Sequence, residues 1–211
     1  MLVPELALVV ALLLGARAGS QLSTGHDAQD AASTLSFARG AGREEEAAEP
    51  SMDWVLAESG DPEGCRRVQA YLGRTSQQNL RAIKQAFHAH IEELYKCPDA
   101  NHVLARLIVE SPSPYAAELC AAFQGRVPAL AKHKYGSRIV ERLLEHSRSV
   151  GATDAFLGEI VADSFALGGH RYGNYVVQHV IEHTSIAWQE RCILNVLHGI
   201  VASSAVSVTV N

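Results

Sequence analysis

The segment His133-Lys-Tyr-Gly-Ser-Arg-Ile-Val-Glu-Arg-Leu-Leu-Glu-His146 returns 37 residues later as His170-Arg-Tyr-Gly-Asn-Tyr-Val-Val-Gln-His-Val-Ile-Glu-His183. Weaker copies lie upstream, at Glu63–Gln69 and Asp99–Ala105. The residue that follows the Gly or Ala of each copy falls at positions 65, 101, 137 and 174. The copies are therefore spaced by 36, 36 and 37 residues. A fixed period of this length is typical of a solenoid, in which each repeat packs on its neighbours.

Each copy has the pattern of a helix with one buried face. In the third copy, apolar residues recur at i, i+1, i+4 and i+5, which indicates a helix that buries this stripe. Ser137, Arg138 and Glu141 occupy the opposite side, with Ser137 and Glu141 one turn apart. The residues that we expect in the core of the last two copies are Ile139, Val140, Leu143, Leu144, Val176, Val177 and Val180.

The other copies present side chains at the same three positions. Each copy offers a pair at i and i+4, and a third side chain follows the first member of the pair. The three positions are occupied in order by Cys65, Gln69 and Arg66, then Asn101, Ala105 and His102, then Ser137, Glu141 and Arg138, and finally Asn174, Gln178 and Tyr175.

The motifs Tyr135–Glu141 and Tyr172–Gln178, each followed by two apolar residues and Glu-His, resemble those of the Pumilio, or PUF, family. The resemblance covers roughly Met52 to Val201. It implies an all-α, curved solenoid of three-helix repeats whose motif helices line the concave face. In that family each repeat binds one base of single-stranded RNA: two side chains hold the base edge and a third stacks between bases.

The family code, applied position by position, implies a base for each repeat. Asn174/Gln178 matches uracil and Ser137/Glu141 guanine, because a carboxylate can accept from two donors on the guanine edge. Cys65/Gln69 matches adenine, while Ala105 replaces the Gln expected beside Asn101 and leaves a weak preference for uracil. Because family members bind RNA antiparallel to the chain, the implied site is 5′-UGUA with a relaxed third position. The implied stacking residues are Arg66, His102, Arg138 and Tyr175.

The same resemblance implies a cytoplasmic, monomeric regulator that binds 3′ untranslated regions of messenger RNA after transcription. Regulatory proteins could contact its convex face. Two other functions stay open at this point. One is a protein-binding solenoid of the armadillo or HEAT type, which has no reason to keep the paired polar positions in register. The other is a PUF-like protein that binds structured RNA in ribosome maturation with little sequence readout.

The charge distribution favours base contacts over phosphate contacts. The chain of 211 residues has a net charge of −5. Residues 1–59 contribute −6, and residues 60–211 contribute +1, so the repeat region has no strong basic patch. Binding to RNA would then depend on base edges and stacking, as in a solenoid that reads bases.

The sequence gives no indication of an enzyme, a metal site or a cofactor. It contains no Ser/His/Asp set, phosphate-binding loop or paired carboxylates. His179 and His183 have the i, i+4 spacing of a zinc pair, but no third ligand is in register and both belong to the repeat. Four cysteines without paired spacing are expected to be reduced thiols, as in the cytosol: Cys65, Cys97, Cys120 and Cys192.

The chain divides into three parts. Residues 1–20 hold an apolar run that resembles a signal peptide, although its eleven residues are fewer than the ~20 that span a bilayer. Residues 21–50 are acidic and rich in Ala, Gly and Ser, and are predicted to be disordered. The repeat domain is predicted to occupy 51–211, with Ser51 as the first N-cap. Ser203–Asn211 matches no repeat motif.

The repeats are predicted to contain a leading helix before each motif helix and a third helix after it. The predicted leading helices are Trp54–Glu58, Phe87–Lys96, Phe123–Ala131 and Ile160–Leu167. The predicted third helices are Gln77–Ala86, Tyr115–Ala122, Asp154–Gly158 and Trp188–Val196. Pro, Gly and Ser break the helices at Glu110–Pro114 and Ser147–Thr153.

Overall fold

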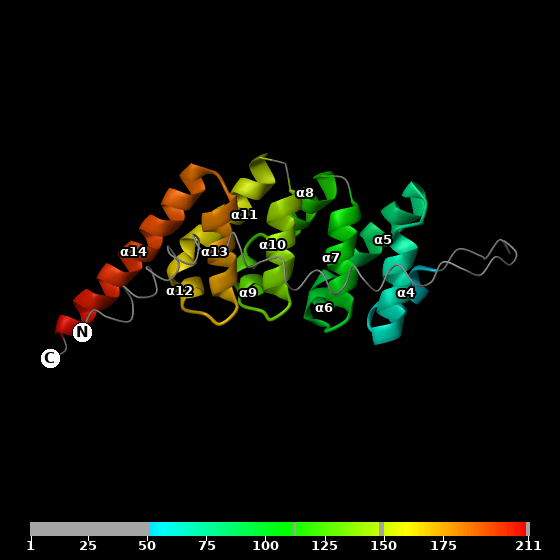
Figure 1. Ribbon diagram of the computed structural model, residues 1–211, viewed down its shortest axis with the longest axis horizontal. Helices are drawn as coiled ribbons and strands as arrows, with labels where there is room; N and C mark the ends of the chain where they lie inside the picture. The colour runs from blue at the N-terminus through cyan, green and yellow to red at the C-terminus, as the bar shows by residue number, and fades with distance from the viewer. Residues whose placement is uncertain (1–50, 112, 148–149, 210–211) are drawn as a thin grey trace, which may run out of the picture.

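A computed structural model describes residues 51–111, 113–147 and 150–209, and all the regular structure in these ranges is helical (Figure 1). The predicted segments 1–20 and 21–50 lie outside the described residues. The helices are α3 (Met52–Ser59), α4 (Pro62–Leu72), α5 (Gln77–Ala89), α6 (Ile91–Lys96), α7 (Ala100–Glu110), α8 (Ser113–Ala122), α9 (Val127–Ala131), α10 (Gly136–His146), α11 (Val150–Ala162), α12 (Ser164–Gly168), α13 (Gly173–His183) and α14 (Ile186–Thr209).

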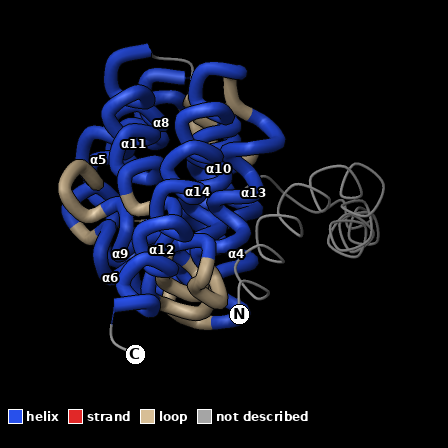
Figure 2. The backbone as a smooth tube through the Cα atoms, turned by 90° about the vertical axis from the view of Figure 1, so that its left-hand side faces the viewer, coloured by secondary structure: helices blue, strands red, loops and turns tan. Residues whose placement is uncertain are grey.

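These helices form four repeats of three: α3–α5, α6–α8, α9–α11 and α12–α14, called repeats 1 to 4. The second helix of each repeat carries the motif. The motif helices pack side by side, α4 on α7, α7 on α10 and α10 on α13 (Figure 1). The third helices form a second layer, α5 on α8, α8 on α11 and α11 on α14. The view along the array places α4, α10 and α13 on one side and α5, α8 and α11 on the other (Figure 2). The predicted all-α solenoid of three-helix repeats is confirmed.

The apolar stripe of the motif helices is buried, as predicted. The side chains of Ile139, Val140, Leu143, Val176, Val177 and Val180 are all 0% exposed. Leu144 differs, because it is only half-buried and packs at the edge of the core. In the pattern i, i+1, i+4, i+5 it stands at the margin of the stripe, which explains its partial exposure.

The motif helices α10 and α13 begin with Gly because each starts against the end of its leading helix. A Cβ on Gly136 would lie 2.4 Å from the carbonyl oxygen of Leu130. A Cβ on Gly173 would lie 2.8 Å from that of Leu167. This close approach leaves no room for a side chain, which explains the Gly of the repeated Tyr-Gly motif.

The leading helices α6, α9 and α12 are shorter than predicted, because turns divide two of the predicted segments, whereas α3 is longer than the predicted Trp54–Glu58. Phe87–Lys96 is split at His90 between α5 and α6. Ile160–Leu167 is split at Asp163 between α11 and α12. The predicted Phe123–Ala131 is reduced to α9 after Gly125, whose φ of 77° ends the preceding turn. The predicted N-cap at Ser51 is confirmed, since its hydroxyl accepts from the Trp54 N–H at 3.2 Å.

The third helices are longer than predicted. α11 begins at Val150, inside the predicted loop Ser147–Thr153, and α14 continues past Val196 to Thr209. The β-branched residues after 203 therefore extend a helix whose earlier turns already pack on α11, α12 and α13. Within the described ranges, no helix has the length and apolar character that crossing a membrane requires.

Candidate functional site

The predicted site residues lie at equivalent places on four adjacent motif helices. We call the pairs at i and i+4 the reading row: Cys65, Gln69, Asn101, Ala105, Ser137, Glu141, Asn174 and Gln178. We call the side chains beside them the stacking row: Arg66, His102, Arg138 and Tyr175. All four members of the stacking row are exposed, and Tyr175 exposes 55% of its surface although it is aromatic. The side-by-side packing of the motif helices brings the two rows together as continuous lines.

The reading row is more buried than a solvated helix face. The side chains of Cys65, Asn101 and Ser137 are only 3–4% exposed, and the second members of the pairs are half-buried. The contact of Cys65 shows the cause, because its thiol donates to the carbonyl oxygen of Asp99, 34 residues away in repeat 2, at 3.2 Å. The row thus lies where neighbouring repeats meet, and its polar groups are partly withdrawn from water, which strengthens any hydrogen bond that they make.

The pair in repeat 1 is already joined. The amide Nε2 of Gln69 donates to the Cys65 sulfur at 3.1 Å. Burial raises the pKa of the Cys65 thiol, so the sulfur stays protonated and uncharged at neutral pH. The pair therefore presents a neutral edge with the Gln69 side chain held in place.

Repeat 2 has lost most of its hydrogen-bonding capacity. Both donors of the Asn101 amide are engaged, one with the carbonyl oxygen of Cys97 at 2.8 Å and the other with that of Pro98 at 2.6 Å. Only the amide oxygen of Asn101 is left to accept. Ala105 offers no polar group in place of the second reader.

Repeat 3 supplies a carboxylate to the reading row. Burial, and next the neighbouring charge of Glu145, raise the pKa of Glu141, while Arg142 and Arg138 act in the opposite direction. Among the described residues, Glu141 takes part in no salt bridge. Its partner Ser137 makes a long hydrogen bond, from its hydroxyl to the carbonyl oxygen of Lys134 at 3.4 Å. An acceptor group is thus held partly desolvated without a strong protein partner.

Repeat 4 contains an unsatisfied acceptor. The Oδ1 atom of Asn174 is buried, and it has no hydrogen-bond partner in the described part of the chain. A buried amide oxygen without a donor costs ~1–3 kcal/mol relative to one that is paired. A ligand that brings a donor to this oxygen would recover that cost.

Two histidines have a role that the sequence did not reveal. The Nδ1 atom of His133 accepts from the backbone N–H of Tyr135 at 3.3 Å and of Gly136 at 3.2 Å. His170 accepts in the same way from Tyr172 and Gly173, both at 3.3 Å. These rings cap the first turns of α10 and α13, which begin with the reading residues. The recurrent His three positions before Gly was the pattern that could have indicated this cap.

Comparison with known proteins agrees with this geometry. The family model of the Pumilio-family RNA binding repeat matches residues 126–156 and 165–198, which lie in repeats 3 and 4. The structure of PUF-8 in complex with PBE-RNA superposes with a TM-score of 0.64 and 26% identity over 71% of this chain and 44% of that one. Repeats 3 and 4 are therefore Pumilio-family repeats.

Other Pumilio structures share the fold. The Puf3 RNA binding domain bound to Cox17 RNA 3′ UTR recognition sequence site A gives a TM-score of 0.62 at 21% identity, over 71% of this chain and 44% of that one. The RNA-binding domain of yeast Puf5p bound to SMX2 RNA gives 0.60 at 17%, over 67% and 41%. The chain thus spans less than half the length of these domains. No curated protein sequence matches it.

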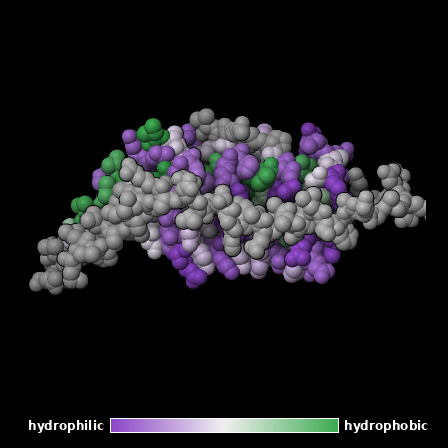
Figure 3. All heavy atoms as spheres, in the orientation of Figure 1, coloured by the Kyte–Doolittle hydropathy of each residue, from purple (hydrophilic) through white to green (hydrophobic). Residues whose placement is uncertain are grey.

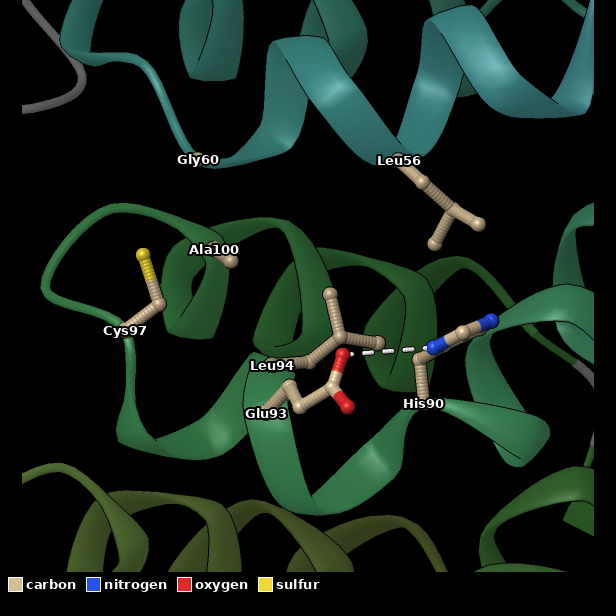
Figure 4. A pocket seen from close by; sticks show the side chains of 7 residues that line it. All are labelled: Leu56, Gly60, His90, Glu93, Leu94, Cys97 and Ala100. Carbon is tan, nitrogen blue, oxygen red and sulfur yellow. Dashed lines mark hydrogen bonds and ion pairs between the residues drawn. The ribbon is translucent and has the colours of Figure 1, made fainter.

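The interfaces between successive repeats differ. Arg126 of repeat 3 forms an ion pair with Glu92 of repeat 2 at 2.6 Å, and Lys132 pairs with Asp163 of repeat 4 at 2.7 Å. Between repeats 1 and 2 there is instead a pocket of about 310 Å³, in which Nδ1 of His90, the residue between α5 and α6, lies 3.3 Å from Oε2 of Glu93 in α6 (Figure 4). Its lining contains no member of the reading row: Leu56, Gly60, His90, Glu93, Leu94, Cys97 and Ala100.

Two further histidines of the repeated motif, His179 and His183, lie on α13. The rings of His179 and His183 lie 4.6 Å apart, and burial lowers the pKa of His179 to about 4, so its ring is neutral at pH 7. The described residues contain no group of His, Cys, Asp and Glu side chains that could hold a metal ion. The four cysteines are free thiols.

Proposed function

We propose that this Pumilio-repeat chain binds single-stranded RNA and reads one base with each repeat, at a site that resembles 5′-UGUA with a relaxed third position. The observation that carries the proposal is the reading row, in which four pairs at i and i+4 lie on adjacent helices with an exposed side chain beside each. A scaffold that binds proteins would not need such pairs at the same positions of every repeat. The assignment of bases rests on the family code applied to these pairs.

The state of each pair fits its assigned base. The unpaired Oδ1 of Asn174 can accept from the N3–H of uracil, the one ring donor of that base. The Glu141 carboxylate can accept from the two donors on the guanine edge, provided that it is ionised. The neutral Cys65/Gln69 pair can present both an amide donor and an acceptor to adenine.

The third base of the site would be held mainly by stacking. Repeat 2 keeps an exposed stacking residue, His102, but its reading pair is reduced to one amide oxygen. Stacking of a base on a ring or guanidinium plane contributes ~1–3 kcal/mol and tolerates any base. We therefore expect the third position to discriminate poorly while it still contributes to affinity.

A binding selection from randomised single-stranded RNA tests the proposal. We expect enrichment of a U-G-any-A core, followed by measured affinities that fall when the first, second or fourth base is changed. Binding without enrichment of a sequence, or binding only to folded RNA, would favour the structured-RNA alternative. Absence of RNA binding would leave a protein-binding solenoid. Affinities for different RNAs should be compared with one another, because the near-neutral repeat region predicts only modest affinity for any RNA.

The role of the bound RNA follows by analogy within the family. Two of the similar domains are bound to 3′ untranslated recognition sequences, those of Cox17 RNA and HO endonuclease RNA. We propose that this chain likewise acts on messenger RNA after transcription. Crosslinking of the chain to RNA in its own cells would identify the targets, and a lack of UGUA-like sites in 3′ untranslated regions would contradict this role.

A further inference from the structure

The last helix carries an apolar stripe on its exposed side. Ile186, Leu194, Leu197 and Val201 of α14 expose 72, 53, 36 and 69% of their surfaces. Their spacing places them on one face of the helix, opposite the buried Cys192. Figure 3 shows this surface as a run of hydrophobic residues along α14 at one end of the array. A contiguous apolar patch of this kind marks a contact surface more often than chance exposure.

Stacking within the array shows what kind of element such a surface takes. In the layer of third helices, α8 is covered by α11 and α11 by α14. The exposed stripe of α14 continues this series, since it lies on the third helix of the last described repeat. An α-helix is therefore the element that fits it by continuity with the interfaces already formed.

We propose that the stripe binds the same stripe of a second copy of this chain, with the two α14 helices antiparallel and centred near Leu194. A two-fold interface requires a patch that is complementary to itself. The exposed Glu190 and His198 each lie four residues from Leu194, in opposite directions. An antiparallel pair thus sets Glu190 of each copy opposite His198 of the other, beside a contact made by the apolar residues.

The pairing would give a particle with two arrays of four repeats, in place of the monomer expected from the sequence. The dimer itself does not depend on RNA binding. If the proposed function also holds, the particle has two UGUA-like sites, and an RNA with two suitably spaced sites would bind more tightly than an RNA with one, because the second contact is intramolecular.

Light scattering coupled to gel filtration tests the pairing on the full chain. We expect a mass of twice 22.7 kDa at tens of micromolar. L194E should lower it to the mass of one chain, because it places two charges at the centre of the contact. V109E is the matched control, since Val109 is an apolar residue of α7 that is 43% exposed away from the stripe, and it should leave the dimer intact. Thermal unfolding of both variants checks that they fold.

A charge exchange tests the register. E190K should weaken the dimer severalfold, and the double variant E190K/H198E should restore it, because the opposite pairs are formed again with reversed sign. The proposal is overturned if the parent chain has the mass of a monomer, if L194E leaves a dimer, or if the double variant is no tighter than E190K. RNA affinity for a single site, measured on L194E, reports separately on the proposed function.

Discussion

Repeats 3 and 4 carry the family motif almost letter for letter, whereas repeats 1 and 2 do not, and yet all four fold alike. The family model matches only the second pair. Repeats 1 and 2 keep the buried apolar stripe and a small residue in the first turn, Gly64 or Ala100, but they lack the Tyr-Gly motif and its capping His. The stripe and the small residue are thus enough for the fold. The rest of the motif specifies how the first turn is capped and what the reading row presents.

The caps show how different residues meet one physical need. The first turn of every motif helix has backbone N–H groups without helical partners. His133 and His170 accept them in repeats 3 and 4, whereas the Asp61 carboxylate accepts from Glu63 and Gly64 in repeat 1. In repeat 2 no side chain among the described residues caps α7, and the Asn101 amide donates instead to the carbonyl oxygens of Cys97 and Pro98 that precede the helix.

The largest effect is expected in the shared core. Leu143→Ala in repeat 3 should lower the free energy of unfolding by ~2–5 kcal/mol, because Leu143 is fully buried. Leu107 holds the equivalent place in repeat 2 and is equally buried, so Leu107→Ala should cost a similar amount. Denaturant unfolding measures both. Glu141→Ala is the control and should be near neutral. A much smaller loss for Leu107→Ala would mean that repeats 1 and 2 are not packed like repeats 3 and 4.

The first residue of the motif helix should separate the two pairs of repeats. Gly136→Ala places a Cβ 2.4 Å from the Leu130 carbonyl oxygen, so the leading helix must shift, and we expect a loss of ~1–3 kcal/mol. Repeat 2 already accommodates Ala100 at this position. Changing Ala100→Gly should cost no more than the ~1 kcal/mol of helix propensity. A shift in melting temperature for Ala100→Gly as large as that for Gly136→Ala would remove this distinction.

Repeat 3 also allows a change of base preference. Glu141→Gln turns a Ser/Glu pair into a Ser/Gln pair, which by the family code reads adenine, because the amide adds a donor where the carboxylate only accepts. Preference should move from UGUA toward UAUA by ~1–3 kcal/mol, a scale taken from bidentate base contacts in DNA. Competition between the two RNAs measures it. Equal weakening for every four-base site would mean that Glu141 reads no base.

How much was predictable depended on whether a feature repeats in the sequence. The period of 36–37 residues and the apolar stripe predicted the solenoid, the motif helices and the core. The sequence did not predict the burial of Cys65, Asn101 and Ser137, because their hydrogen bonds go to backbone carbonyl groups, and backbone partners leave no trace in residue type. The sequence also did not predict helix ends such as the split at His90, because the backbone contacts there leave no trace in residue type.

The pH dependence offers a further test of the reading row. The pKa of Glu141 is raised, mainly by burial, so its carboxylate protonates at a higher pH than an exposed Glu as the solution is acidified. Preference for guanine over adenine at the second base should therefore fall as pH drops through this raised pKa. The uracil pair Asn174/Gln178 does not titrate and serves as the internal control. Binding measured at the two positions from neutral pH downward should show the loss at the second base first.

The stability of the fold should change with pH in the opposite sense. Because the folded state holds the Glu141 proton more tightly than the unfolded state does, the cost of burying the charge is present at neutral pH and is relieved as pH falls. Glu141→Gln removes this cost, so it should leave stability at pH 7 unchanged or slightly raised. A clear destabilisation by Glu141→Gln would show that the carboxylate has a strong partner in the folded protein.

The smallest effect is expected when repeat 2 is given the second polar side chain that its pair lacks. Ala105→Gln supplies the missing second reader beside Asn101 and should tighten binding to UGUA and restore some preference for uracil at the third base. One added hydrogen bond contributes ~0.5–1.5 kcal/mol, or up to about tenfold in affinity. The gain should stay below that of a complete pair, because both donors of Asn101 remain engaged with Cys97 and Pro98.

Comparison of UGUA with UGAA, UGCA and UGGA in the parent chain and in Ala105→Gln measures this gain. Val109→Gln is the control, since it adds the same side chain one turn further along α7, outside the reading row. If Ala105→Gln tightens binding to all four RNAs equally, the new amide contacts the RNA without reading the base, and repeat 2 cannot be repaired by one residue.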